Sequence, residues 1–436
     1  MAILTGWAKL ASTNFLSAGL SFLATVVAAR ALGLAEFGLL AVVIAYARVI
    51  DGLFNFQSVT VLTRFLTEAE HAGDDPWFRG LIKAGFLVDG LTAVFSTLIA
   101  VGALVFLGGM LDLPADWIVP AMLFCLVILT RIFGVTEAVL RCFDAYWAIG
   151  LRGTIGSALL LLGVVLAWQA EWSVFGFVAV WAVSEAIANL LFLAWTFRML
   201  RMRRLGSIWQ ADMTAALSKA RGFWRQLWQT NVTFGVRILS QDADMLVANT
   251  FLGPAAAGLL KVAKDLAGIA SQFGRPIQQA ASPHLTKLLL KQGGQVAVAY
   301  SFRISLMTAA PVLVVAVLAL FWAEPFLIRV YGAEFGAAGL LVAILLVSNA
   351  LYLAGVCLLP MTTALDLAGT FLVSILVSTG VFLACLVLTT PLIGLTGIAI
   401  AHIAFNATWL LFNWPKVHRR GRAYDHAASV PRDLTR

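Results

Sequence analysis

The chain has 436 residues, of which 61% are hydrophobic and only 12% are charged. A soluble protein carries about twice that share of charged residues, so the composition excludes an ordinary soluble domain and indicates a polytopic membrane protein. The net charge of +8 would suit a nucleic-acid-binding protein only if the basic residues formed a binding surface rather than a membrane-topology pattern.

Twelve apolar stretches approach the roughly 20 residues that a helix needs to cross a bilayer. In chain order they lie at 10–32, 37–57, 80–108, 116–140, 149–168, 174–197, 224–250, 255–280, 300–322, 337–357, 368–389 and 393–414. Helices pair their backbone groups internally, as lipid requires. We therefore predict an all-α polytopic membrane protein with about 12 transmembrane helices in two six-helix lobes. The seventh and eighth stretches are the weakest, because polar residues interrupt them.

The same turn occurs in each half of the chain. Residues 32–40 read LGLAEFGLL and residues 252–260 read LGPAAAGLL. The first glycine of each copy, Gly33 or Gly253, suits a helix end that needs a left-handed residue. The second, Gly38 or Gly258, opens the next helix and permits close helix approach. We interpret these glycines as structural turns that mark an internal repeat of six spans plus six.

A basic linker at 198–223 divides the chain near its middle. It contains DMTAALSKARGFWRQLW from Asp212 onwards, with apolar residues three or four positions apart. This spacing predicts an amphipathic helix on the inner membrane surface. We predict an N-terminal six-helix lobe at 1–197, the linker at 198–223, a C-terminal six-helix lobe at 224–414 and a basic tail at 415–436.

The basic residues predict the orientation. The linker region carries Arg198, Arg201, Arg203, Arg204, Lys219, Arg221 and Arg225, and the tail carries Lys416, Arg419, Arg420, Arg422, Arg432 and Arg436. The opposite turns hold little beyond Arg30 and Arg329. The positive-inside rule then places both termini in the cytoplasm of an inner (plasma) membrane protein. The charge is explained by topology and by anionic membrane lipids, so we expect no nucleic-acid partner.

Ionisable residues inside the spans are costly and are therefore functional candidates. Five bases form a predicted cationic cavity that binds substrate: Arg48, Arg131, Arg237, Lys261 and Lys264. Five acids are candidates for ion coupling or charge balance: Asp51, Asp89, Glu137, Glu185 and Asp244. Arginine suits bidentate contact with a diphosphate, and lysine offers a point charge.

Internal neutralisation is the alternative for the same charges. Arg48 and Asp51 lie three residues apart, and Lys261 precedes Asp265 by four, so each pair shares a helix face. One aspartate cannot neutralise both Lys261 and Lys264, which favours a functional role for Lys264. Arg237 fits a side chain that reaches toward the membrane interface.

Two segments resemble a known family. ALGLAEFGLLAVVIAYARVIDG resembles the opening hairpin of bacterial polysaccharide exporters, the O-antigen flippase-like members of the multidrug/oligosaccharidyl-lipid/polysaccharide (MOP) exporter superfamily. DADMLVANTFLGPAAAGLLKVAKDLA, followed by ASPHLTKL, is similar to that family's seventh and eighth helices. The residues that match there are Asp244, Leu252, Gly253, Gly258 and Ala263, whereas Asn249 replaces a usual Gly, Leu260 a usual Tyr and Thr286 a usual Ser.

The resemblance implies a flippase with two bundles around a central cavity. Its substrate would be an undecaprenyl-diphosphate-linked oligosaccharide used for surface polysaccharide or lipopolysaccharide, including O-antigen, and a polysaccharide polymerase would be a partner. The alternatives are an ion-coupled multidrug exporter of the same superfamily and an integral-membrane O-antigen polymerase or glycosyltransferase. Major facilitator transporters share six-plus-six repeats, but the segment after span 2 lacks their usual basic turn.

Catalytic motifs are missing from the sequence. It contains no G-x-x-x-x-G-K-[ST] phosphate-binding loop and no G-x-S-x-G motif. The four cysteines, at 125, 142, 357 and 385, lie in or beside apolar stretches and suit neither a metal site nor a disulfide framework. We therefore expect a transporter rather than an enzyme, with no cofactor and no metal.

Overall fold

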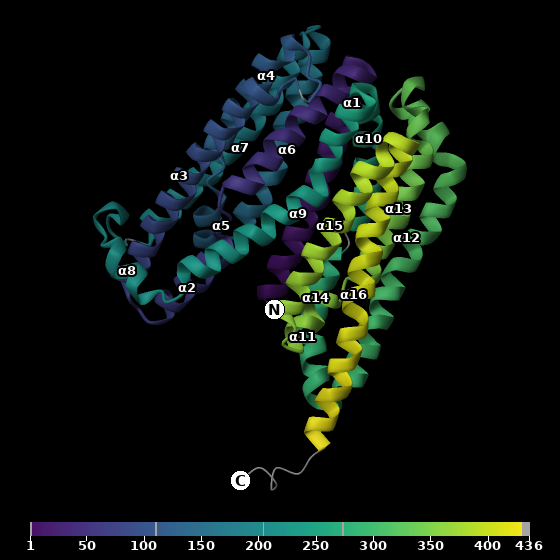
Figure 1. The fold of residues 1–436 in the computed structure, drawn as a ribbon. Helices are drawn as coiled ribbons and strands as arrows, with labels where there is room; N and C mark the ends of the chain where they lie inside the picture. Colours follow the sequence, from purple (N-terminus) through teal and green to yellow (C-terminus); the bar gives the residue numbers. More distant parts are fainter. Residues whose placement is uncertain (1, 110, 204, 273, 430–436) are drawn as a thin grey trace. The chain divides into compact units, whose positions relative to one another are not determined.

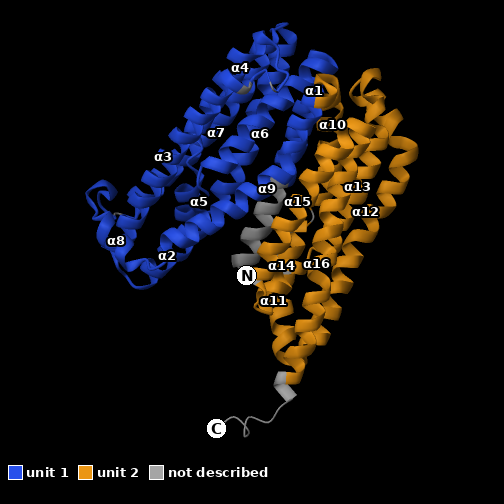
Figure 2. Ribbon diagram, in the orientation of Figure 1, with its two compact units in different colours: residues 1–250 blue, residues 251–436 orange. Residues whose placement is uncertain are grey.

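A computed structural model describes residues 2–109, 111–203, 205–272 and 274–429, and these residues are helical almost throughout (Figure 1). They form two compact units, residues 1–250 and 251–436 (Figure 2). Arg204 of the predicted linker and residues 430–436 of the predicted tail lie outside the described residues.

The first unit contains eleven helical segments. They are α1 (Ala2–Phe54), α2 (Val59–His71), α3 (Asp75–Leu107), α4 (Ala115–Cys125), η1 (Leu126–Thr130), α5 (Phe133–Cys142), α6 (Tyr146–Gln169), α7 (Val174–Met202), η2 (Ile208–Gln210), α8 (Met213–Lys219) and α9 (Phe223–Leu252). The largest contacts within this unit join α1 to α6 and α6 to α7.

The second unit contains eight segments. They are α10 (Pro254–Ser271), α11 (Gly274–Gln292), α12 (Gly294–Val330), η3 (Ala333–Ala338), α13 (Gly339–Ala354), α14 (Leu358–Ala364), α15 (Ala368–Ile393) and α16 (Leu395–Ser429). Its largest contacts join α12 to α13 and α15 to α16.

These helices follow the predicted spans. Among the described residues, nine segments are long and apolar enough to cross a membrane, and the first of them, Phe15–Phe54, covers most of the first two predicted spans. The predicted span at 224–250 corresponds to α9, and the one at 255–280 covers α10 and the start of α11; none of these helices is among the nine. The polar residues that weaken these two stretches in the sequence account for this difference.

Both copies of the repeated turn have the same backbone conformation. Gly33 interrupts the long helix α1 with φ 74° and ψ 174°, and Gly253 precedes α10 with φ 84° and ψ 175°. This combination of positive φ and extended ψ is essentially restricted to glycine. The second glycines, Gly38 and Gly258, are buried.

The predicted linker packs on the start of α3. Ala216 and Ala220 are buried in a core that includes Leu81 and Phe223. The indole of Trp77 donates to the Ala216 carbonyl at 3.1 Å. The linker is therefore fixed to the first unit by apolar packing and by hydrogen bonds to its backbone.

Helix α9 also packs within the first unit. A Cβ on Gly52 would lie 2.7 Å from Ile238, and one on Gly235 would lie 3.2 Å from the Gly52 carbonyl oxygen. These two glycines allow α1 and α9 to approach closely. The compact unit ends at residue 250, two residues before the end of α9, while the lobe boundaries at 197, 224 and 414 stay predictions.

Candidate functional site

The fourth predicted span is a broken helix. It consists of α4, η1 and α5, and the chain leaves helical geometry at Arg131 (φ −86°, ψ 59°) and Ile132 (φ −90°, ψ 67°). Such a break frees backbone groups that lipid cannot satisfy. The Asn55 amide donates to the Arg131 carbonyl at 3.2 Å and so satisfies one of them.

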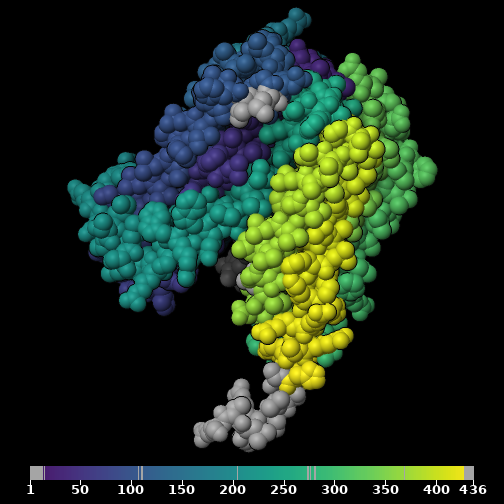
Figure 3. All heavy atoms as spheres, in the orientation of Figure 1, coloured from purple at the N-terminus to yellow at the C-terminus, as the bar shows by residue number. Residues whose placement is uncertain are grey.

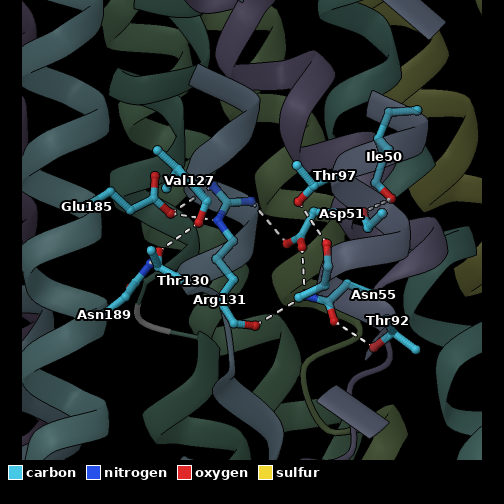
Figure 4. A network of polar contacts seen from close by, with 12 residues as sticks. Ile50, Asp51, Asn55, Thr92, Thr97, Val127, Thr130, Arg131, Glu185 and Asn189 are labelled. Carbon is cyan, nitrogen blue, oxygen red and sulfur yellow. Dashed lines mark hydrogen bonds and ion pairs between the residues drawn. The ribbon is translucent and has the colours of Figure 1, made fainter. Parts of the chain in front are cut away.

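The Arg131 side chain at this break is held by two carboxylates (Figure 4). Its Nη1 lies 3.0 Å from Asp51 Oδ2, and its Nε and Nη2 lie 2.8 and 2.7 Å from Glu185 Oε1. The Arg131 side chain is only 5% exposed and that of Glu185 is 29% exposed. The structure thus brings together three predicted site residues from α1, α7 and the break.

Neutral side chains hold this triad in position. Asn55 donates to Asp51 Oδ1 at 2.9 Å, and Thr92 donates to the Asn55 side-chain oxygen at 3.0 Å. On the other side of the break, Asn189 donates to Thr130 Oγ1 at 2.9 Å. Figure 4 shows these residues converging on Arg131 from both sides.

Asp89 caps the second half of the broken helix. One of its oxygens accepts from the Val135 backbone N–H at 2.7 Å, and the other accepts from Ser58 Oγ at 2.6 Å. A carboxylate is stabilised by the positive end of a helix. Gly134 leaves room for this cap, since a Cβ there would lie 1.9 Å from Ser58 Oγ and 2.6 Å from Asp89 Oδ2.

Arg152 is a cation that the sequence analysis missed. Its Nε and Nη2 donate to Asn189 Oδ1 at 3.2 and 2.9 Å, and its guanidinium lies 4.0 Å from the centre of the Phe133 ring. It is also within electrostatic range of Glu185. Its place inside predicted span 5 was the signal that could have identified it, because an intramembrane arginine is rare.

Arg48 differs from Arg131 in exposure and in pairing. It is exposed, and among the residues that the structure describes no carboxylate forms an ion pair with it. It does lie within electrostatic range of Glu185. Asp51, which the sequence offered as a partner for Arg48, pairs with Arg131 instead because the fold places the broken helix beside α1.

The other candidates of the first unit lie outside this network. Glu137 pairs with the arginine four residues later in α5. Arg237 is exposed and lines an open depression on α9 with Gln229, Thr230, Thr233 and Phe234. Asp244 is fully buried on the same helix.

In the second unit, Lys261 and Lys264 lie on α10, and Lys261 forms an ion pair there. The Lys261 ammonium lies 2.6 Å from Asp265 Oδ1, one turn later on the same helix. Both lysines are half-buried. This geometry gives Lys261 its own carboxylate, as the neutralisation alternative anticipated.

The network around Glu185 has a surplus of positive charge. The three guanidinium groups of Arg48, Arg131 and Arg152 lie within electrostatic range of Glu185, and Arg131 also pairs with Asp51. Glu137, which is within range of Arg152, already pairs with Arg141. Arg131 is occupied by Asp51 and Glu185, so the surplus resides on the other two arginines. Chemically, this arrangement can stabilise an anionic group that loses water inside the membrane. In the described part of the chain, no group of three or more His, Cys, Asp or Glu residues could hold a metal ion.

Comparisons with known proteins give a consistent result. Residues 3–289 match the family described as "Polysaccharide biosynthesis protein". The chain is 25% identical over 261 residues to the "Inner membrane protein YghQ" of Escherichia coli (strain K12), an alignment that covers 60% of this chain and 74% of that protein.

Two solved structures share the fold over nearly the whole chain. An inward-facing multidrug resistance MATE family transporter of the MOP superfamily aligns with a TM-score of 0.71 and 15% identity, over 95% of this chain and 96% of that one. The lipid II flippase MurJ, in an inward closed conformation, aligns with a TM-score of 0.68 and 12% identity, over 97% and 93%. These likenesses confirm the predicted all-α membrane fold of 12 helices in two lobes.

Proposed function

We propose, since the chain belongs to the polysaccharide biosynthesis protein family, that it moves a lipid-linked oligosaccharide across the inner membrane. The family and the structural neighbours are membrane transporters and flippases rather than enzymes. The proposed substrate is an oligosaccharide on a polyprenyl diphosphate such as undecaprenyl diphosphate, destined for surface polysaccharide or lipopolysaccharide. Both termini would lie in the cytoplasm.

The observation that carries this proposal is the surplus of guanidinium charge around Glu185. A diphosphate must lose its hydration to cross a region of low dielectric constant, which is costly unless cations replace the water. Arg48 is exposed and has no ion pair among the described residues, so its fork of donors is accessible to a phosphate. Arg131 would act indirectly, by holding Glu185 and Asp51 in place.

Lys264 is the proposed phosphate contact of the second unit. It is half-buried on α10, three residues after Lys261 and directly before Asp265. A compact ammonium offers a point charge to a phosphate oxygen.

The test replaces one cation at a time. Arg48→Ala and Lys264→Ala should each lower export about tenfold or more, because a lost charge-assisted hydrogen bond costs about 1.5–3 kcal/mol. Membrane abundance should stay near normal, since among the described residues no carboxylate forms an ion pair with Arg48 and the Lys264 side chain is only half-buried. Lys264→Arg should retain part of the activity. The measurement is surface polysaccharide in cells that lack the native gene, beside membrane levels of each variant.

Arg64→Ala is the matched control. Arg64 is an exposed base that pairs with Glu68 on α2, away from the triad, and its loss should leave export unchanged. Normal export by both Arg48→Ala and Lys264→Ala would rule out these two residues as substrate contacts. Loss of either variant from the membrane would support a structural role in its place.

A multidrug exporter is the second candidate, favoured by the TM-score of 0.71 to a MATE family transporter. The two functions differ in the charge of the substrate. Cells carrying the protein should become resistant to cationic drugs only if the second candidate holds, and that resistance should not depend on Arg48.

A further inference from the structure

The described part of the basic tail, 415–429, packs on the start of α12. Beyond Pro415 the described residues continue α16 as far as Ser429. There Asp425 accepts from the backbone N–H of Gly294, and its second oxygen accepts from the Gln295 N–H at 2.9 Å. The carboxylate thus caps the first turn of α12, where a negative charge is favourable.

Close backbone contact locks the same junction. A Cβ on Gly294 would lie 2.2 Å from the Gly421 carbonyl oxygen, so only glycine fits there. Val417 is fully buried in a core with Leu289 and Val298. Three elements, α11, the start of α12 and the end of α16, therefore form one end of the second unit. Figure 3 shows the end of α16 on the surface of this unit.

Along both α12 and α16, the exposed side chains change from aliphatic to aromatic toward the docked end. Leu306 and Met307 on α12 are 50% and 65% exposed, and Leu411 on α16 is 75% exposed. Toward the docked end an aromatic layer follows, in which the Phe302 and Trp414 rings meet at 5.0 Å. Such a passage from apolar to aromatic residues is typical of the interface between acyl chains and headgroups.

Beyond the aromatic layer the exposed surface is basic. Seven exposed cations belong to this end of the unit: Lys287, Lys291, Arg303, Lys416, Arg419, Arg420 and Arg422. The only described acid in 274–303 and 414–429 is Asp425, which is engaged in capping α12, and Asp366 lies in the turn before α15. The surface beyond the apolar and aromatic residues of α12 and α16 is therefore strongly positive.

We propose that this docked end is a binding site for the headgroup of an anionic phospholipid. The phosphate would meet the cations of α16 while the acyl chains lie along the exposed apolar residues of α12 and α16. Charge complementarity selects an anionic over a zwitterionic headgroup. Docking adds specificity, because the cap at Asp425 fixes the cations beside the aromatic layer. The proposal does not depend on the transported substrate.

The first test is lipid binding to the full-length protein in detergent, followed by native mass spectrometry. The probes are phosphatidylglycerol, phosphatidylcholine with the same acyl chains, and soluble glycerol phosphate. Phosphatidylglycerol should bind most tightly. Changing Lys416, Arg419 and Arg422 together to Gln should weaken its binding by about tenfold or more, since each base near an anionic headgroup contributes severalfold.

The control removes the same charge elsewhere, from the exposed residues Arg201, Arg221 and Arg225, and should change phosphatidylglycerol binding less than twofold. Equal losses in both triple variants would show diffuse attraction and overturn the proposal. Equal binding of the two phospholipids would also overturn it. Glycerol phosphate that displaces the lipid at equal concentration would indicate a soluble phosphate site instead.

Asp425→Asn distinguishes binding at a docked site from simple attraction by net charge. This change makes the protein more positive, so simple attraction predicts tighter binding of phosphatidylglycerol. The docked site predicts the opposite, because the neutral side chain caps α12 less well and releases the cations from their position. Weaker binding, with an unchanged helical circular dichroism spectrum, supports the site. Tighter or unchanged binding contradicts it.

Discussion

At the scale of the residue, burial separates arginines that look alike in the sequence. Arg131 and Arg48 both lie inside predicted spans, yet the Arg131 side chain is 5% exposed and contacts two carboxylates. Removing one partner of such a buried group is costly, about 3–5 kcal/mol, because the remaining charges lose their compensation. Arg48 has no such carboxylates to leave behind, so its removal tests function rather than folding.

Gly134 gives a sharper test at this scale. Gly134→Ala should destabilise the protein by about 1–3 kcal/mol through overpacking, because the new Cβ would lie 1.9 Å from Ser58 Oγ. The clash displaces the Asp89 cap of α5. The measurement is the melting temperature of the purified protein together with its abundance in membranes.

Gly90→Ala is the control for that change. Gly90 lies in α3 near Asp89, and a Cβ there would meet nothing within 4 Å. Alanine is the better helix former by about 1 kcal/mol, so this variant should be neutral or more stable. Equal melting temperatures for the two variants would show that the space around Asp89 and Ser58 is not restrictive.

At the scale of the element, short polar contacts position segments that hydrophobicity alone leaves undefined. The linker helix α8 has only seven residues, so it depends on its contacts with α3. Asp74, at the start of α3, accepts from Lys219 Nζ at 2.6 Å and from the Trp77 N–H at 2.9 Å. The Lys219 hydrogen bond, followed by the backbone bond from Trp77, holds the pKa of Asp74 below its usual value.

The lowered pKa of Asp74 predicts how this linker responds to pH. A depressed carboxyl pKa means that the contact stabilises the fold above the unfolded value of about 3.9, and that this contribution is lost as pH falls through the lower folded pKa. Amide hydrogens of 213–220 should therefore exchange faster, after correction for the intrinsic rate, at pH 3 than at pH 6.

Asp74→Asn should produce faster exchange of 213–220 already at pH 6 and remove most of the pH effect. Asp75→Asn, one residue further on, is the matched control and should behave as the unchanged protein. An identical pH response in the Asp74 variant would mean that another group controls the packing of α8.

At the scale of the whole molecule, the remaining prediction is orientation. Both termini and the linker at 198–223 should lie in the cytoplasm, and the turn at 109–115 should lie outside. In a variant whose four native cysteines are replaced, a cysteine at Ser207 should resist an impermeant thiol reagent in intact cells. A cysteine at Asp112 should react. The reverse pattern of labelling would show that the topology is opposite to the predicted one.

The sequence by itself determined the class of fold. A bilayer imposes span length and internal hydrogen bonding on every membrane helix, and both requirements are visible in local composition. The predicted all-α fold and membership of a transporter superfamily are confirmed by the fold and the family match. The turns at Gly33 and Gly253 could also be predicted from the sequence, because a positive φ is a local property that glycine adopts readily.

Only the tertiary structure decided which charges meet. Asp51 and Glu185 lie 80 and 54 residues from Arg131, and the sequence paired Asp51 with Arg48 because local spacing shows only neighbours on one helix. The supporting roles of Asn55 and Asn189 were also invisible, since an asparagine in a span acquires a role only from what packs against it. Likewise, the sequence predicted a basic tail at 415–436 but not that Asp425 caps α12, 131 residues away at Gly294. Electrostatic partners in a membrane protein follow from distance in space, because the interaction energy of two charges rises as their separation falls and a low dielectric constant strengthens it further.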